Sequence, residues 1–320
     1  LLTALASSYH TVVAARFLAG LPHGAFFGIA ALVATSLAGP ERRAWAVARV
    51  LLGLMIANVI GVPIATALGQ HLGWRSAFVL VALIGVATIL ALRSWVAESA
   101  APHGASLRTE LRVLRRPQVW LTLGVGAIGF GGMFAVYSYI TPTLTSLAGM
   151  RATTVPFVLA VWGLGMVAGN IVGGWLADRG VVRAMLITLA TTAVFLALFT
   201  VTSRYAVAAT ATAFLLGTTV AMGPALQVRL MDVAADAQTI TAALVHSAFN
   251  AANALGPWLG GLALASGFGW TAPAWVGVAL AIGGIVMLGG SVLVERFEVT
   301  TKASPATALP ASFEPLKECA

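Results

Sequence analysis

Long apolar segments follow one another along the chain, separated by short polar stretches. Each is about as long as the roughly 20 residues that a helix needs to cross the hydrocarbon core of a bilayer. The segments are continuously apolar and rich in Ala, Leu and Gly, which favours helices over the alternating strands of a membrane barrel. The sequence therefore predicts nine membrane-spanning helices, over residues 10–37, 45–69, 75–95, 117–142, 154–177, 183–202, 205–228, 239–266 and 271–294.

The composition supports the same class. Hydrophobic residues make up 59% of the 320 residues and charged residues only 9%, whereas an ordinary soluble domain carries about 25% charged residues. This excludes a soluble enzyme, a nucleic-acid module and a disordered scaffold. The one cysteine, Cys319, argues against a disulfide framework or a multi-cysteine metal site. We predict an all-α polytopic membrane protein, with the lipid bilayer as its partner and no nucleic acid.

The positive charges are distributed unevenly between alternate loops. Of the 18 Lys and Arg residues, Arg16 falls within the first span and three (Arg75, Arg151 and Arg204) lie in one set of loops. The other fourteen lie in the opposite set, which by the positive-inside rule is cytoplasmic. The net charge of +8 therefore indicates topology rather than an anionic partner. We expect a multi-pass protein of the cytoplasmic (inner) membrane with a cytoplasmic C-terminus.

A weak internal repeat relates the two ends of the chain. Residues 17–20 resemble 214–217, residues 57–61 resemble 252–256, and residues 73–74 resemble 269–270. Spans four to six have no counterpart, so we expect an N-terminally truncated chain with nine of twelve transmembrane helices. The predicted organisation is the last three helices of an N-terminal half (1–95), a basic cytoplasmic linker (96–116), a six-helix C-terminal half (117–294) and a cytoplasmic tail (295–320).

Four motifs carry a resemblance to a known family. Residues 16–20 read Arg-Phe-Leu-Ala-Gly, 53–63 read Gly-Leu-Met-Ile-Ala-Asn-Val-Ile-Gly-Val-Pro, 174–179 read Gly-Trp-Leu-Ala-Asp-Arg, and 246–256 read His-Ser-Ala-Phe-Asn-Ala-Ala-Asn-Ala-Leu-Gly. With the two halves and the basic loop, these resemble the major facilitator superfamily, and within it the drug:proton antiporters of the arabinose-efflux and chloramphenicol-efflux type. The loop motif departs from the family pattern at Val181 and Val182, and the arginine motif departs from it at Ala19.

The resemblance implies the major facilitator fold and secondary active transport. The expected function is export of small molecules, drugs such as chloramphenicol or sugars, by proton antiport with alternating access. The expected energy source is the proton gradient, without a bound cofactor or metal, and the expected oligomeric state is a monomer. An importer of a small metabolite, a non-transporting membrane protein and an inactive transporter fragment remain alternatives. An intramembrane enzyme is not expected, because no nucleophile–base pair or metal-ligand cluster lies in any span.

The short loop after residue 177 is a candidate gate. Asp178 can face the positive N-terminal end of a neighbouring helix, for which we expect the span that starts near Thr239. The alternative for Asp178 and Arg179 is a solvated turn. By resemblance to the antiporter motif, Gly61 and Pro63 are candidates for a hinge, since proline removes a helix hydrogen bond.

Glycines four residues apart share a helix face and predict close helix packing in lipid. Such spacing occurs at Gly165, Gly169 and Gly173, and at Gly53, Ala57 and Gly61. Static packing is the general expectation for these faces. A role in sliding or bending is expected for Gly61 alone.

Proton coupling calls for a titrating group within the membrane. All ten Asp and Glu residues lie at span edges, in loops or in the tail, so the carboxylate is expected upstream of this sequence. His246 and His23 are the alternatives, because imidazole titrates near neutral pH. Arg16 lies within a span, where it either reaches the outer interface or tunes a nearby acid, since an arginine does not release its proton.

The resemblance also implies a substrate cavity lined by the first, second, fourth and fifth helices of each half. Apolar walls with a few polar groups suit amphipathic molecules. The candidate cavity residues are polar or aromatic residues of those helices, and each is also a candidate for plain helix packing: Phe26, Asn58, Tyr137, Tyr139, Trp162, Asn170, Gln227, Phe249, Asn250 and Asn253.

Overall fold

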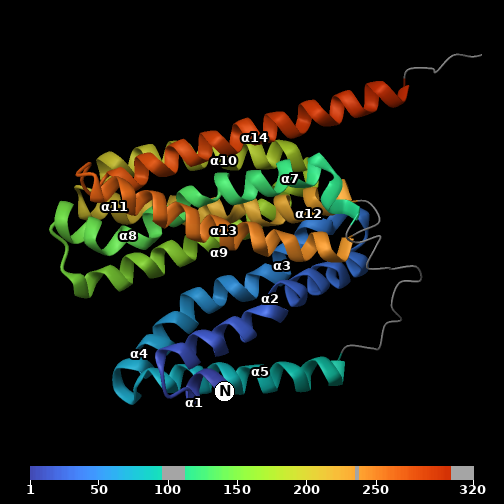
Figure 1. Ribbon diagram of the computed structural model, residues 1–320. Helices are drawn as coiled ribbons and strands as arrows, with labels where there is room; N and C mark the ends of the chain where they lie inside the picture. The colour runs from blue at the N-terminus through green and yellow to red at the C-terminus, as the bar shows by residue number, and fades with distance from the viewer. Residues whose placement is uncertain (96–111, 235–237, 304–320) are drawn as a thin grey trace, which may run out of the picture.

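The computed structural model describes residues 1–95, 112–234 and 238–303, and all regular structure in these ranges is helical (Figure 1). The first part of the chain forms α1 (Leu2–Leu5), α2 (Tyr9–Ala38), a 3-10 turn η1 (Pro40–Arg42), α3 (Arg43–Ile56), a π-helical segment η2 (Ala57–Gly61), α4 (Val62–Leu72) and α5 (Trp74–Trp95). Of the predicted linker, only residues 112–116 are described, with a 3-10 turn η3 (Val113–Arg115).

The second part contains the remaining helices. These are α7 (Pro117–Gly124), the π-helical segment η4 (Val125–Gly129), α8 (Gly131–Leu147), the 3-10 turn η5 (Ala152–Thr154), α9 (Val155–Arg179), α10 (Val181–Thr202), α11 (Ala206–Thr218), the 3-10 turn η6 (Thr219–Ala221), α12 (Met222–Ala234), α13 (Gln238–Ala265) and α14 (Ala272–Ala303).

Nine long helical segments in the described chain correspond to the nine predicted spans. Seven are long and apolar enough to cross a membrane by length and composition alone. The other two are α2 and α13, which are 30 and 28 residues long. The prediction of an all-α polytopic membrane protein is confirmed.

Three spans continue five or more residues beyond their predicted ends. The span predicted to end at 142 continues in α8 to Leu147, the one predicted to end at 228 continues in α12 to Ala234, and the one predicted to end at 294 continues in α14 to Ala303, so residues 295–303 are helix rather than tail. For the last two, polar contacts between the helices accompany the extension, including an ion pair in which Arg229 Nη2 lies 2.8 Å from Glu295 Oε2. Polar side chains that bind each other across two helices let both helices extend past the apolar run.

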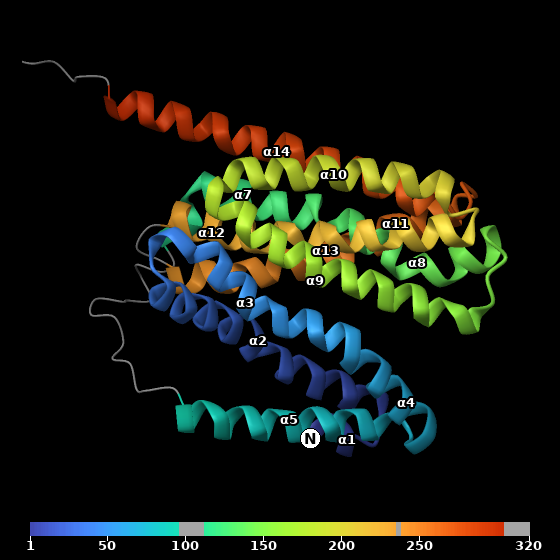
Figure 2. The ribbon, with the colours of Figure 1, turned by 180° about the vertical axis from the view of Figure 1, so that it is seen from behind.

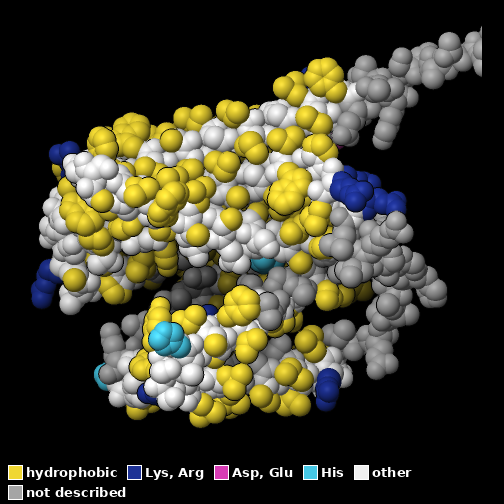
Figure 3. Space-filling view, viewed as in Figure 1, with side chains coloured by type: hydrophobic (Ala, Val, Ile, Leu, Met, Phe, Trp, Pro, Cys, Tyr) yellow, Lys and Arg dark blue, Asp and Glu magenta, His cyan; other side chains and the backbone are white. Residues whose placement is uncertain are grey.

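The helices form two parts, α1–α5 and α7–α14 (Figures 1 and 2). We call the end with residues 39–42, 112–116 and 180 the linker end, and the end with residues 73, 148–154 and 203–205 the distal end. The two parts come together at the linker end, where α3 packs on α9 and α12, and α2 packs on α13. They diverge toward the distal end, and Figure 3 shows a hollow between them on that side.

Glycines allow two helices of the second part to pack with their backbones in contact. A side chain at Gly169 would meet the backbone of Thr218, and one at Gly165 would meet the carbonyl oxygen of Phe214. The predicted close packing is confirmed for this face of α9. It does not appear at Gly53 in α3, where no described atom of another helix lies within 4 Å of the position that a Cβ would take.

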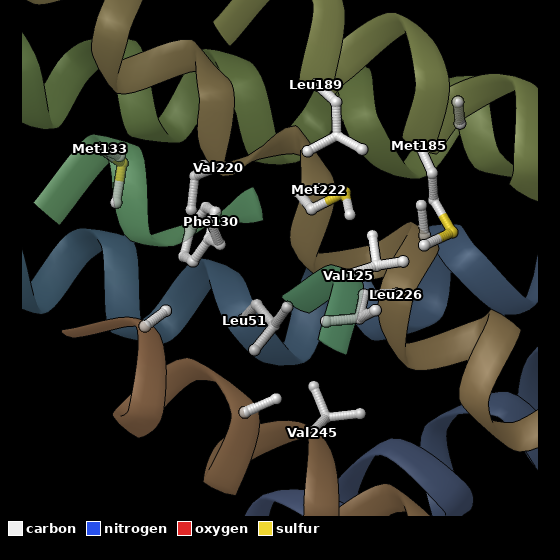
Figure 4. Packing of buried hydrophobic residues seen from close by; sticks show 14 of the residues in the cluster. Leu51, Val125, Phe130, Met133, Met185, Leu189, Val220, Met222, Leu226 and Val245 are labelled. Atoms are coloured by element: carbon white, nitrogen blue, oxygen red, sulfur yellow. The ribbon is translucent and has the colours of Figure 1, made fainter. Parts of the chain in front are cut away.

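The buried core runs through both parts and includes residues of α3 as well as of α7–α14. Figure 4 shows Leu51 of α3 near Phe130, which joins η4 to α8, and Val220 of η6. All three belong to one cluster of buried side chains. At Leu51, the first part therefore shares a hydrophobic core with the second part.

Candidate functional site

A cavity of about 280 Å³ lies where the two parts meet. Six helical elements of both parts (α3, α8, α9, η6, α12 and α13) line it, with side chains that are mostly aromatic, aliphatic or methionine. The lining residues are Leu51, Leu54, Met55, Phe130, Met133, Phe134, Tyr137, Trp162, Met166, Val220, Gly223, His246, Phe249, Asn250 and Asn253. Its volume is close to the lower limit of about 300 Å³ for pockets that hold small molecules.

Half of the predicted cavity residues line this cavity. They are Tyr137 on α8, Trp162 on α9, and Phe249, Asn250 and Asn253 on α13. The sequence reasoning missed the methionines Met133 and Met166, although each lies four residues from a predicted aromatic residue and so on the same helix face. That spacing was the signal that could have found them.

The other predicted cavity residues lie elsewhere. The Tyr139 hydroxyl donates to the Pro257 carbonyl at 2.9 Å, which ties α8 to α13. Asn170 Nδ2 donates to the Ala48 carbonyl at 2.6 Å, which ties α9 to α3.

Gln227 is buried within α12, and Phe26 is exposed, with its ring edge-on to Phe27 at 5.6 Å. Neither residue lines the cavity that the described side chains form. The side chains of Asn58, Pro63 and His23 lie outside the described part of the structure.

Polar contacts join the two parts at the linker end. The Asp178 carboxylate accepts hydrogen bonds from the backbone N–H of Ala44 at 2.9 Å and of Trp45 at 3.1 Å. Arg43 Nη1 lies 2.8 Å from Asp232 Oδ1, so an ion pair joins α3 to α12. With the Asn170 hydrogen bond, these contacts hold the first turns of α3 against α9 and α12.

Asp178 does face the N-terminal end of a helix, but the predicted partner was wrong. The helix is α3, which begins at Arg43, and not α13, which begins at Gln238. Gly174 explains the choice, because a Cβ there would lie 2.8 Å from the Ala48 Cβ. The missing side chain lets α9 approach α3, and the first N–H groups of a helix have no partner within it.

The two arginines predicted for gating or coupling both lie on aromatic rings. The Arg179 guanidinium lies over the Trp175 ring at 3.7 Å and donates to the Trp175 carbonyl, so Arg179 packs on its own helix. Arg16 is exposed and its guanidinium lies 5.6 Å from the Phe78 ring centre. Its coupling role therefore stays a prediction.

His246 is the predicted coupling residue that lines the cavity. It is 6% exposed, and its ring lies 4.6 Å from that of Phe27 on α2 and 6.1 Å from that of Phe249. The ring thus sits between α13 and α2, the helices that join the two parts. Gly61 ends the π-helical segment η2, directly before the first turn of α4 that contains Pro63.

A buried polar cluster lies outside the cavity at the linker end of the second part. Arg229 binds the Glu295 carboxylate with both Nη atoms and lies 3.3 Å from Ser291 Oγ. The Ser291 hydroxyl donates to Gln118 Oε1 at 2.7 Å. This cluster joins α12, α14 and α7, and sequence reasoning did not identify it.

Comparison with known sequences and structures agrees with this architecture. The sequence model of the Major Facilitator Superfamily matches residues 1–242 and 143–319. The chain is 37% identical over 273 residues to the inner membrane transport protein YdhP of Escherichia coli, covering 84% of this chain and 70% of that protein. It is 29% identical over 307 residues to a chloramphenicol resistance protein of Streptomyces lividans, covering 94% of this chain and 77% of that protein.

Among solved structures, the fold is similar to that of the E. coli fucose:proton symporter FucP. The TM-score is 0.66 at 15% sequence identity, and the match covers 89% of this chain and 77% of the symporter. At this identity the likeness concerns the fold alone.

Proposed function

Because this chain belongs to the Major Facilitator Superfamily, and is therefore a multi-pass membrane transporter rather than an enzyme, we propose that it exports small molecules across the cytoplasmic membrane in exchange for protons. The observation that carries the proposal is the cavity between the two parts, which pack together at the linker end through contacts such as that of Asp178 and diverge at the distal end (Figure 3). A site that is closed on one side and open on the other is one of the two states that alternating access requires.

The direction of transport rests on the relatives and on the charge distribution. Relatives of this chain are named as a chloramphenicol resistance protein and a probable sugar efflux transporter. The excess of Lys and Arg at the linker end fits a cytoplasmic location, which makes the conformation described here outward-facing. We further propose that the protein works as a monomer in the bilayer, driven by the proton gradient, with no bound cofactor and no nucleic-acid partner.

His246 is the proposed proton-binding residue among the described side chains. It lines the cavity, its ring contacts the first part at Phe27, and imidazole titrates near neutral pH. A proton on His246 would therefore act on both the cavity and the contact between α13 and α2. Replacing His246 with Gln keeps a polar side chain and removes the titration.

Efflux assays test the proposal. The full chain is expressed in a bacterial host that lacks its own exporters, and retained radiolabelled chloramphenicol or arabinose is measured with and without a protonophore. We expect the cells to lose label, and we expect the protonophore to abolish this loss. In the variant His246→Gln, efflux should no longer depend on the proton gradient. Accumulation of label would indicate an importer, insensitivity to the protonophore would refute proton exchange, and no movement of any substrate would refute transport by this chain.

A further inference from the structure

The cavity wall has a chemistry that selects among possible substrates. Among its described lining residues there is no Asp, Glu, Lys or Arg. Three of its polar side chains, His246, Asn250 and Asn253, lie on α13. A cation placed there would lose its water without gaining a residue of opposite charge, which is strongly unfavourable. The wall therefore favours uncharged molecules over cations.

The aromatic part of the lining favours an aromatic ring. Phe130, Phe134 and Phe249 contribute aromatic surface, and their rings contact one another, with Phe130 5.4 Å from Phe134 and 5.1 Å from Phe249. Three methionines, Met55, Met133 and Met166, line the same cavity. Thioether sulfur is polarisable and makes favourable contacts with aromatic rings, and the flexible side chain adapts to irregular shapes.

One hydrogen-bond donor in this wall has no partner. Trp162 is fully buried, at 0% exposure, and its Nε1–H has no acceptor among the described residues. Buried tryptophan N–H groups ordinarily find an acceptor, and an unpaired buried polar group is an exception that calls for an explanation. Trp162 is among the lining residues, but its side chain is covered in this conformation, so a bound molecule supplies the acceptor when neighbouring side chains move aside.

The position of Trp162 is fixed before any ligand arrives. Its ring meets Tyr137 edge-on at 5.4 Å, and a Cβ at Gly217 of α11 would collide with the Trp162 carbonyl oxygen. The backbones of α9 and α11 are therefore in contact at this point, and the Tyr137 ring packs against the indole. A donor held in place in advance loses little entropy when it binds an acceptor.

We propose, on the basis of the proposed function, that the substrate is a small uncharged aromatic molecule with a hydrogen-bond acceptor oxygen, which accepts from Trp162 Nε1–H. The ring of the substrate packs among Phe130, Phe134 and the methionines, and its remaining polar groups face Asn250 and Asn253. A sugar fits this wall poorly, since most of its hydroxyl groups would lose water without finding a partner. Of the two kinds of substrate named for the relatives, the cavity lining therefore favours chloramphenicol over a sugar.

Binding to the purified full chain tests the substrate class. The protein is reconstituted in lipid nanodiscs, without a proton gradient, and binding is measured by isothermal titration calorimetry. The probes are chloramphenicol (uncharged, aromatic, with acceptor oxygens), naphthalene (aromatic, without an acceptor), tetraphenylphosphonium (an aromatic cation) and arabinose (uncharged, not aromatic). We expect chloramphenicol to bind at least 10-fold more tightly than arabinose or tetraphenylphosphonium. Equal or tighter binding of either of these would overturn the proposal.

Replacing Trp162 with Phe tests the hydrogen bond. The change keeps an aromatic ring in the wall and removes the donor. One hydrogen bond corresponds to an increase of about 5- to 10-fold in the Kd for chloramphenicol, with little change for naphthalene. Trp258→Phe on α13 is the matched control, because Trp258 is 62% exposed and does not line the cavity. Equal losses for chloramphenicol and naphthalene would assign Trp162 a packing role and refute the hydrogen bond.

Indole NMR of the unmodified chain gives a test that does not depend on the variant folding. Chloramphenicol should move the Nε1–H resonance of Trp162 downfield, and naphthalene should not. The absence of a downfield shift at saturating chloramphenicol would refute the proposed hydrogen bond. Chloramphenicol that binds but is not exported by cells would contradict the proposed function and leave this substrate class intact. Export of sugars without chloramphenicol binding would support the proposed export function and overturn the proposed substrate class.

Discussion

Replacing Asp178 with Asn should weaken the closure of the linker end. The carboxylate accepts from the backbone N–H groups of Ala44 and Trp45, 134 and 133 residues away in sequence, at the start of α3. An asparagine amide oxygen can still accept one of these bonds, but it brings no negative charge to the positive end of the helix. The variant therefore loses the charge interaction and part of the hydrogen bonding, with little change in shape.

The size of the effect follows from the geometry and from exposure. A hydrogen bond to a charged group contributes about 1.5–3 kcal/mol when it is shielded from water. The Asp178 side chain is exposed, so water competes for it, and we take about 1 kcal/mol for the change to Asn after discounting for solvent. Since 1.4 kcal/mol is about a tenfold change in an equilibrium constant, the ratio of closed to open linker ends should fall about fivefold.

Distances between spin labels across the linker end measure this ratio directly. Labels attached at Glu41 in η1 and Leu186 in α10, in a background where Cys319 is replaced by Ser, report separation of the two parts by double electron–electron resonance. We expect a longer-distance population to grow in Asp178→Asn, together with reduced efflux and normal membrane insertion.

Asp232→Asn is the matched control, because it breaks a partly exposed ion pair with Arg43 that contributes at most about 1 kcal/mol. A distance distribution for Asp178→Asn that equals the wild type would refute the reasoning. So would a larger shift in Asp232→Asn than in Asp178→Asn.

Two further predictions concern stability, measured as thermal unfolding in detergent. Gly169→Ala should destabilise the protein by about 1–3 kcal/mol, because the added methyl group meets the Thr218 backbone, whereas Gly53→Ala, which has open space around it, should not lower the melting temperature. Glu295→Leu should cost about 2 kcal/mol or more, because it leaves the buried Arg229 guanidinium without its partner. Arg229→Met should cost less, because the Glu295 side chain is 47% exposed and can turn to water; the reverse order would contradict this account of the pair.

The apolar pattern predicted the helices well because lipid leaves the backbone few alternatives. Predicted and observed ends of the second span, 45–69 against 43–72, differ by a few residues. The pattern failed where helix formation no longer depends on apolar side chains. Arg229 and Glu295 read as the edge of the membrane in the sequence, but they bind each other across α12 and α14, and both helices continue.

The cavity was predictable only where one helix face carries several signals. On α13, His246, Asn250 and Asn253 are three or four residues apart and share a face, so finding one favoured the others. Tyr139 and Asn170 do not line this cavity, because a polar side chain in a membrane helix can either face a cavity or bind a neighbouring helix, and the sequence does not distinguish the two. Both bind a backbone carbonyl of a neighbouring helix instead of facing the cavity.

The choice of partner for Asp178 depends on a residue that carries no functional group. At the linker end both α3 and α13 begin, and each helix start offers N–H groups that have no partner within the helix. Charge and spacing cannot distinguish them, and sequence reasoning chose α13. Gly174 decides for α3, because its missing side chain lets α9 lie against Ala44 and Ala48. The position of the carboxylate is thus a consequence of backbone packing one turn away, and any residue larger than glycine at 174 would have to move α3, and with it the closure of the linker end.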